Sequence, residues 1–131
     1  MHHLLIVDDQ RDIQLLLEYY FNSKGYAVTT ASSGVDACEI ARSREFELGL
    51  VDWQMPEMDG VAVCRHLLAD AAAANRKIGV WLMTGYDPSV VKAEAESAGA
   101  LAVLSKPFNP VQVVALFEEY LHTRSPSGMR R

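Results

Sequence analysis

The sequence has only two cysteines in 131 residues, Cys38 and Cys64, and both lie among apolar neighbours in segments with helical spacing. So few cysteines support neither a disulfide framework nor a metal knuckle, and we expect two reduced thiols packed in the core. The chain also lacks any run approaching the roughly 20 apolar residues that a membrane-spanning helix requires. Its first residues turn acidic too soon for a signal peptide, so we expect no membrane insertion and a cytoplasmic location.

Basic residues are also few, because 12 Lys and Arg stand against 17 Asp and Glu and the formal net charge is -5. This charge has the wrong sign for gripping a phosphate backbone, so no direct binding to nucleic acid is expected. Apolar residues, in contrast, make up 50% of the chain and charged residues 22%. This composition and length predict one globular domain with a buried core and no separate output domain.

Short apolar runs alternate with segments of helical spacing five times along the chain. The runs are too short for helices and predict buried strands at 4–7, 26–31, 48–51, 78–83 and 101–104. Helices are predicted at 12–23, 35–41, 60–73, 88–98 and 111–121. Five strands that are each followed by a helix favour a doubly wound α/β fold, with parallel strands, right-handed crossovers and helices on both faces of the sheet.

The pattern also predicts the buried face of the first helix, the extent of the last helix and the end of the domain. The expected buried face of the first helix consists of Ile13, Leu16, Leu17, Tyr20 and Phe21. The last helix is expected to continue its apolar spacing from Val111 through Phe117 to Leu121. Residues 123–131 have no apolar periodicity, so we predict a domain over residues 1–122 followed by a disordered tail.

Polar residues follow four of the predicted strands at the same edge of the sheet. Asp8 and Asp9 follow the first strand, Asp52 the third, Thr84 the fourth and Lys106 the fifth. Ligands of open α/β sheets bind beyond the carboxyl ends of the strands, so we expect these side chains to converge there. Taken singly, each has an ordinary explanation as a helix cap, a turn residue or a surface charge. Their shared position favours a common function.

Three carboxylates brought this close repel one another, at about 4 kcal/mol for two charges 4 Å apart in an effective dielectric of 20. A hard divalent cation offsets this repulsion, and Mg²⁺ accepts one or two carboxylates together with water and a phosphate oxygen. A free carboxylate oxygen of Asp52 can then attack a phosphoryl group in line and form an acyl phosphate. The ammonium of Lys106 and the hydroxyl of Thr84 are suited to hold the remaining phosphoryl oxygens.

Four segments carry a resemblance to a known family: VDD at 7–9, DWQMPEMDG at 52–60, Thr84-Gly85 and Ser105-Lys106-Pro107-Phe108. In order and spacing they resemble the receiver domain of two-component response regulators, of the single-domain, chemotaxis-like type. The resemblance spans nearly the whole chain. It implies the flavodoxin-like strand order 2-1-3-4-5 and a phosphoprotein that switches the binding of an unidentified downstream protein.

The resemblance also implies roles for individual residues. Asp52 would accept a phosphoryl group from a sensor histidine kinase or a histidine phosphotransfer protein. Mg²⁺, with Mn²⁺ as an alternative ion, would bind directly to Asp9, Asp52 and the backbone carbonyl of Gln54, while Asp8 would help through water. Thr84 and Lys106 would hold the phosphoryl oxygens. The protein would not be an enzyme beyond its own phosphorylation and autodephosphorylation.

One departure from the family pattern concerns the switch. Receivers usually have a tyrosine or phenylalanine three residues before the lysine, whereas this chain has Val103. Valine has no ring to turn inward when the threonine moves, so the usual coupling of threonine and aromatic residue is in doubt. Tyr86 is a candidate substitute, although it could simply line the rim of the site. Gln54 and Tyr86 also occupy the two positions that in this family tune hydrolysis of the acyl phosphate.

Other functions fit the sequence less well. A pseudo-receiver, which would bind partners without being phosphorylated, is suggested by Val103 but opposed by the intact Asp52, Thr84 and Lys106. A phosphatase of the haloacid dehalogenase type needs a second aspartate two residues after the nucleophile, where this chain has Gln54. A flavin carrier needs backbone donors for a phosphate after the first strand, where this sequence is acidic.

Overall fold

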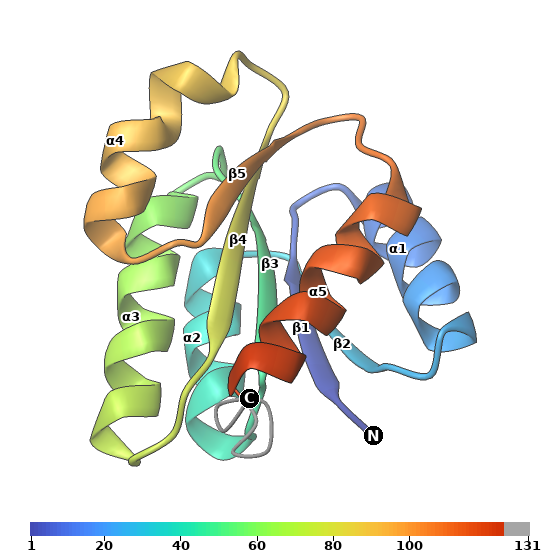
Figure 1. Cartoon of the computed structure of the whole chain (residues 1–131). Helices are drawn as coiled ribbons and strands as arrows, with labels where there is room; N and C mark the ends of the chain where they lie inside the picture. The colour runs from blue at the N-terminus through green and yellow to red at the C-terminus, as the bar shows by residue number, and fades with distance from the viewer. Residues whose placement is uncertain (125–131) are drawn as a thin grey trace.

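Within residues 1–124, the part of the chain that the computed structural model describes, five strands alternate with five helices (Figure 1). The strands are β1 (His3–Val7), β2 (Ala27–Ala31), β3 (Leu48–Asp52), β4 (Gly79–Thr84) and β5 (Ala102–Ser105). The helices are α1 (Arg11–Ser23), α2 (Gly34–Ser43), α3 (Gly60–Ala73), α4 (Pro88–Ala98) and α5 (Pro110–Arg124). All strands pair in parallel in the order β2-β1-β3-β4-β5. This confirms the doubly wound fold and its strand order.

Helices α2, α3 and α4 begin at residues with specific capping chemistry. The side chains of Ser33 and Asp59 accept hydrogen bonds from backbone N–H groups in the first turns of α2 and α3. Asp87 caps α4 in the same way, and Pro88 occupies the first turn, where its missing N–H has no cost. At the other end of α4, Gly99 adopts a left-handed conformation with φ 95°. The N-terminal caps fix the loops that lead from β2, β3 and β4 into α2, α3 and α4.

Two apolar layers cover the sheet. Helices α1 and α5 pack on one face, and α2, α3 and α4 pack on the other (Figure 1). Neighbouring strand residues therefore enter opposite layers: Leu82 of β4 belongs to the layer under α2, α3 and α4, and Met83 to the layer under α1 and α5. Because both faces are covered, the inner strands read as continuous apolar runs rather than alternating ones.

Aromatic rings fill the layer under α1 and α5. The ring of Phe117 on α5 lies 5.4 Å from that of Phe21, 5.9 Å from Tyr26 and 4.9 Å from Trp81, measured between centroids. Trp81, in the middle of β4, is 3% exposed and belongs to this core. Cys38 and Cys64 are both buried and free, as predicted. Tyr26 belongs to this core but precedes β2, so the strand begins one residue later than predicted.

Several apolar residues that the spacing assigned to buried elements are exposed instead. Leu16 is 64% exposed because the buried stripe of α1 runs through Gln14, Leu17 and Phe21, and residues adjacent in sequence point about 100° apart around a helix. Val111 is 62% exposed, and Leu101 is 52% exposed and lies before β5. The predictions for Leu16 and Val111 were wrong because periodicity alone does not fix which edge of an apolar stripe meets the sheet. Leu101 is exposed because it precedes β5, which is an edge strand.

The C-terminal boundary is only partly described. Helix α5 continues to Arg124, two residues past the predicted domain end at 122. The rest of the predicted tail, residues 125–131, lies outside the described residues, so its disorder stays a prediction. Among the helices of residues 1–124, none is both long and apolar enough to cross a membrane.

Candidate functional site

The carboxyl ends of four strands meet at one edge of the sheet and bring the predicted residues together. Asp52 is the last residue of β3 and Thr84 the last of β4. Asp8 and Asp9 follow β1 directly, and Lys106 follows β5. One carboxylate oxygen from each of Asp8, Asp9 and Asp52 can be chosen so that all three lie within 4.8 Å of one another. The order of the parallel strands thus accounts for the cluster.

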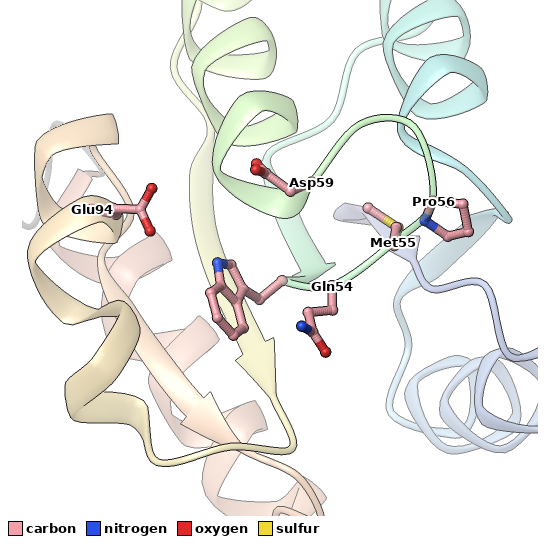
Figure 2. Close-up of a pocket in the computed structure, with 6 residues that line it drawn as sticks. Gln54, Met55, Pro56, Asp59 and Glu94 are labelled. Atoms are coloured by element: carbon pink, nitrogen blue, oxygen red, sulfur yellow. The ribbon is translucent and has the colours of Figure 1, made fainter.

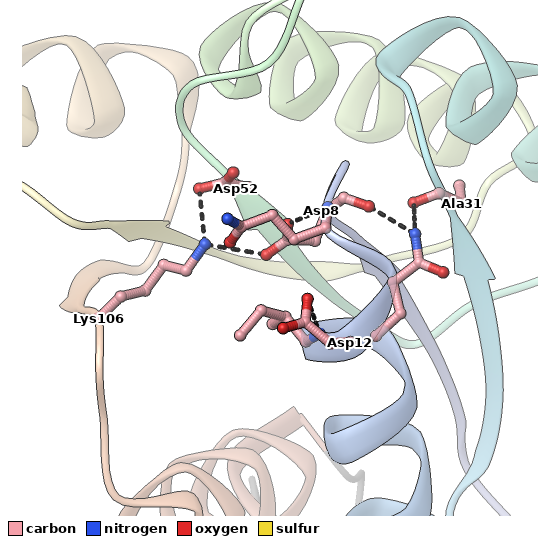
Figure 3. Close-up of polar contacts among 8 residues, drawn as sticks. Asp8, Asp12, Ala31, Asp52 and Lys106 are labelled. Carbon is pink, nitrogen blue, oxygen red and sulfur yellow. Dashed lines mark hydrogen bonds and ion pairs between the residues drawn. The ribbon is translucent and has the colours of Figure 1, made fainter.

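The ammonium of Lys106 joins two of these acids. Its Nζ donates to Oδ2 of Asp8 at 2.9 Å and lies 3.4 Å from Oδ1 of Asp52 (Figure 3). Asp8 is fully buried, Asp52 is 7% exposed, and Asp9 is exposed. The sequence did not distinguish these environments. A buried carboxylate needs a partner, and Lys106 provides one for Asp8 and, at a longer distance, for Asp52.

The charge environment of Asp52 is unusual for an aspartate. Burial and then the nearby negative charge of Asp8 raise the pKa of Asp52 from 3.8 to about 6, although Lys106 opposes them. Burial by itself lowers the pKa of Lys106, but its hydrogen bond with Asp8 and the charge of Asp52 outweigh that effect and raise it. Lys106 therefore stays protonated at neutral pH, and the site as a whole holds an excess of negative charge.

Thr84 is held between two backbone contacts beside the cluster. Its carbonyl accepts a hydrogen bond from the backbone N–H of Lys106 at 2.7 Å, and its hydroxyl oxygen accepts one from the N–H of Tyr86 at 3.0 Å. Thr84 is 1% exposed, whereas Tyr86 is 58% exposed. The Tyr86 ring meets Trp53 edge to face at 6.0 Å between centroids. Tyr86 thus connects the Thr84 hydroxyl with the residue that follows Asp52.

The turn at residues 53–59, between β3 and α3, presents Asp52 at the site. The N–H of Trp53 donates to the carbonyl of Met83 at 2.8 Å, and the N–H of Gly60 donates to the carbonyl of Trp53 at 2.8 Å. A Cβ at Gly60 would overlap the carbonyl oxygen of Asp52 and would lie 2.9 Å from the Cα of Trp53. Only glycine fits this close approach, which explains the glycine that ends the DWQMPEMDG segment.

A pocket of about 480 Å³ lies beside this turn (Figure 2). It is lined by residues of the turn and one residue of α4: Trp53, Gln54, Met55, Pro56, Asp59 and Glu94. Gln54 is exposed in this turn, two residues after Asp52. A metal bond from its backbone carbonyl stays a prediction.

Val103 is half-buried and packs against the layer under α2, α3 and α4.

Sequence reasoning missed one residue of the site's surroundings. Gln14 is 1% exposed, and its side-chain Nε2 donates to the backbone carbonyl of Asp8 at 2.5 Å. The apolar spacing of α1 drew attention to Leu16 instead. A glutamine on the buried face of α1 would have indicated a structural role for Gln14. The sequence did not show which face of α1 is buried, so this indication was missed.

The donor set of the cluster fits a hard divalent cation. Its three side chains offer only carboxylate oxygens, which Mg²⁺ and Ca²⁺ prefer over nitrogen and sulfur ligands. Lys106 supplies one positive charge against three carboxylates, so it does not compensate all of their negative charge. Asp9 is exposed and therefore accessible to a hydrated ion. These features fit Mg²⁺ with two carboxylates and several retained waters.

Comparison with known proteins agrees with this arrangement. The family model for the response regulator receiver domain matches residues 4–118. Sporulation initiation phosphotransferase F of Bacillus subtilis is 32% identical over 122 residues, which cover 93% of this chain and 95% of that protein. The transcriptional regulatory protein ZraR of Escherichia coli is 37% identical over 123 residues, which cover 93% of this chain but only 27% of ZraR.

Solved structures show the same fold. The chemotaxis protein CheY4 of Vibrio cholerae has a TM-score of 0.81 and 28% identity, covering 91% of this chain and 98% of its own. The response regulator TrrA of Thermotoga maritima, in complex with Mg²⁺ and BeF, has a TM-score of 0.78 and 25% identity, with coverage of 91% and 98%. By its sequence and its fold, the chain therefore belongs to the response regulator receiver domain family.

Proposed function

We propose that this receiver domain accepts a phosphoryl group on Asp52 from a histidine kinase or a histidine phosphotransfer protein, in a reaction that requires Mg²⁺. The observation that carries the proposal is the position of Asp52. It ends the central strand β3, with one oxygen 3.4 Å from the Lys106 ammonium and within the cluster formed with Asp8 and Asp9. Receiver domains are phosphorylated by proteins of these two classes.

The transfer is a substitution at phosphorus. A carboxylate oxygen of Asp52 forms a bond to the phosphoryl group while the bond between phosphorus and the donor's imidazole nitrogen breaks, and that nitrogen keeps the electron pair. With a pKa of about 6, Asp52 is ionised at pH 7.5 and available as the nucleophile. Its partial burial removes much of the water that would otherwise solvate and weaken it.

Lys106 and Thr84 are placed to hold the product. The Lys106 ammonium already lies against one oxygen of Asp52 and supplies a point charge for a phosphoryl oxygen. The Thr84 hydroxyl ends the adjacent strand β4, and turning its proton toward the phosphoryl group adds a second donor. Because Tyr86 donates to that hydroxyl, a shift of Thr84 would pull on the contact between Tyr86 and Trp53. This contact is our proposed substitute for the aromatic residue that Val103 replaces.

Magnesium would be held by Asp9, Asp52 and the backbone carbonyl of Gln54, with Asp8 acting through water, and Mn²⁺ would serve in its place. When bound, the ion neutralises negative charge on the carboxylates and the phosphoryl oxygens. The complex of TrrA with Mg²⁺ and BeF supports this part of the proposal. Asp8 differs from the other two acids, because it is fully buried and has the shorter contact with Lys106, at 2.9 Å against 3.4 Å for Asp52. The downstream target is a protein, and we place the function in the cytoplasm.

Intact-mass spectrometry tests the proposal directly. Incubation with acetyl phosphate and Mg²⁺ should add one phosphoryl group to the unchanged protein and none to Asp52→Ala. Glu96→Ala, which removes an exposed carboxylate from α4, is the matched control and should be modified normally. An unmodified parent protein, or modification that persists in Asp52→Ala, would contradict the proposed acceptor. Val103 was the motive for the alternative of a pseudo-receiver, and no contact within residues 1–124 adds to it.

A further inference from the structure

One buried polar side chain has no part in the chemistry described so far. Gln14 lies in the first half of α1 and is 1% exposed. Its Nε2 donates to the carbonyl of Asp8 at 2.5 Å, to the carbonyl of Ala31 at 3.2 Å and to the hydroxyl oxygen of Ser32 at 3.0 Å. Figure 3 shows the first two of these bonds, which join the ends of β1 and β2. A single amide thus connects two strand ends with α1.

The orientation of this amide is fixed by its neighbours. Oε1 of Gln14 accepts a hydrogen bond from Nη1 of Arg11 at 2.7 Å, one turn earlier in the helix. Rotating the amide by half a turn would place Oε1 against the carbonyl oxygens of Asp8 and Ala31 and would face its NH₂ group toward the guanidinium. Both changes are unfavourable, so Nε2 stays directed at Asp8.

Asp8 is held at every polar group it has. Its N–H donates to the carbonyl of Ala31 at 3.1 Å, and its Oδ1 accepts from the N–H of Gln10 at 2.9 Å. Its Oδ2 accepts from Lys106, and its carbonyl accepts from Gln14. The bond from Gln14 holds the Asp8 carbonyl, which belongs to the same peptide group as the N–H of Asp9. That peptide group sets the direction in which the exposed Asp9 leaves the strand.

We propose that Gln14 is a positioning residue for the acidic cluster. It fixes the peptide between Asp8 and Asp9 and so holds the Asp9 carboxylate where it can share a cation with Asp52. The inference rests on the proposed function, since it assumes that Mg²⁺ binds at this cluster. Outer partners of this kind orient metal ligands and lower the reorganisation that binding requires.

The test compares two substitutions in the same helix. Gln14→Met keeps the length and shape of the side chain but removes its hydrogen bonds. Phe21→Leu is the control, because it loosens the core two turns away, where α1 faces Phe117, without a contact to the cluster. The dissociation constant of Mg²⁺ is measured for each by titration of tryptophan fluorescence, which reports on Trp53 next to Asp52. We expect it to rise about tenfold in Gln14→Met, as for other outer partners, and to stay unchanged in Phe21→Leu.

A spectroscopic readout separates positioning from general destabilisation. The amide nitrogen of Asp9 shares a peptide group with the carbonyl that Gln14 contacts, so its ¹⁵N chemical shift should move in Gln14→Met and not in Phe21→Leu. Equal Mg²⁺ affinity in Gln14→Met and the parent, with an unmoved Asp9 resonance, would overturn the positioning role and leave the cation site intact. A parent protein without any response to Mg²⁺ would instead refute the cation site of the proposed function.

A measurement on the unchanged protein covers the case in which Gln14→Met does not fold. The side-chain NH₂ protons of Gln14 should exchange slowly with solvent, and their resonances should shift when Mg²⁺ is added, because they touch the peptide that carries Asp9. Rapid exchange, or resonances indifferent to Mg²⁺, would contradict the inference.

Discussion

Replacing Asp52 by asparagine should stabilise the metal-free protein at alkaline pH. Asparagine has nearly the same shape but never carries a charge, so it removes the cost of keeping a carboxylate in this partly buried, acidic site. The pKa of Asp52 rises from 3.8 to about 6 on folding, and at 1.36 kcal/mol for each unit this corresponds to about 3 kcal/mol. Water that enters the site and relaxation of nearby groups reduce the cost of a buried charge, so about 3 kcal/mol is the upper value of this free-energy difference.

The sign of the effect follows from proton linkage. Between pH 4 and pH 6 the folded protein keeps a proton on Asp52 that the unfolded chain has already released. The contribution of Asp52 to stability is therefore fully present below its unfolded pKa and is lost as the pH rises through about 6. The Asp52→Asn protein keeps an uncharged side chain at every pH, so it does not lose this stability as the pH rises. The two proteins should have similar stability near pH 4 and differ by up to about 3 kcal/mol at pH 8.

Urea unfolding followed by circular dichroism, in EDTA and at several pH values, measures this difference. The change at Asp52 is compared with Glu96→Gln, which also converts a carboxylate to an amide but on the exposed side of α4. The control should show no comparable pH-dependent gain. If Asp52→Asn were less stable than the parent at pH 8, or if the difference were constant with pH, the electrostatic account of the site would be refuted.

Three further predictions concern the same site. Mg²⁺ at a hundredfold excess over its dissociation constant should raise the free energy of unfolding by about 2.7 kcal/mol, and thermal scans should show a smaller gain in Asp52→Asn. Gly60→Ala should cost about 1–3 kcal/mol, because a new Cβ meets the backbone of Asp52, whereas Gly85→Ala, with open space around it, should be far milder in urea titrations. Lys106→Met should lower stability at pH 7 by about 3 kcal/mol, since it leaves the buried Asp8 carboxylate without its cation; a variant as stable as the parent would show that Asp8 is not charged.

The convergence of the polar residues was predictable because parallel strands leave a single geometric solution. Asp52 and Thr84 end adjacent strands, and the apolar run before each of them identifies its strand in the sequence. Once the runs are assigned to parallel strands, their carboxyl ends must share one edge. The fold and the membership of the site follow from this local pattern.

The roles within the cluster were not predictable in the same way. Asp8 and Asp9 are adjacent and identical in chemistry, yet one is fully buried and the other exposed. That difference depends on how β1 leaves the sheet, which is set by long-range contacts such as those of Lys106 and Gln14. Leu16 shows the same limit, because its exposure depends on the rotation of α1 against the sheet rather than on the spacing of apolar residues.

The ammonium of Lys106 has a consequence for ion selectivity. At pH 7.5 the three carboxylates and this one cation leave two net negative charges in the cluster, which a divalent ion cancels and a monovalent ion does not. Lys106 acts as a tethered counterion that occupies the inner side of the cluster at the buried Asp8, so an incoming ion is directed to the solvent side at Asp9. Sodium and potassium at physiological concentration should therefore screen the cluster without displacing the divalent occupant.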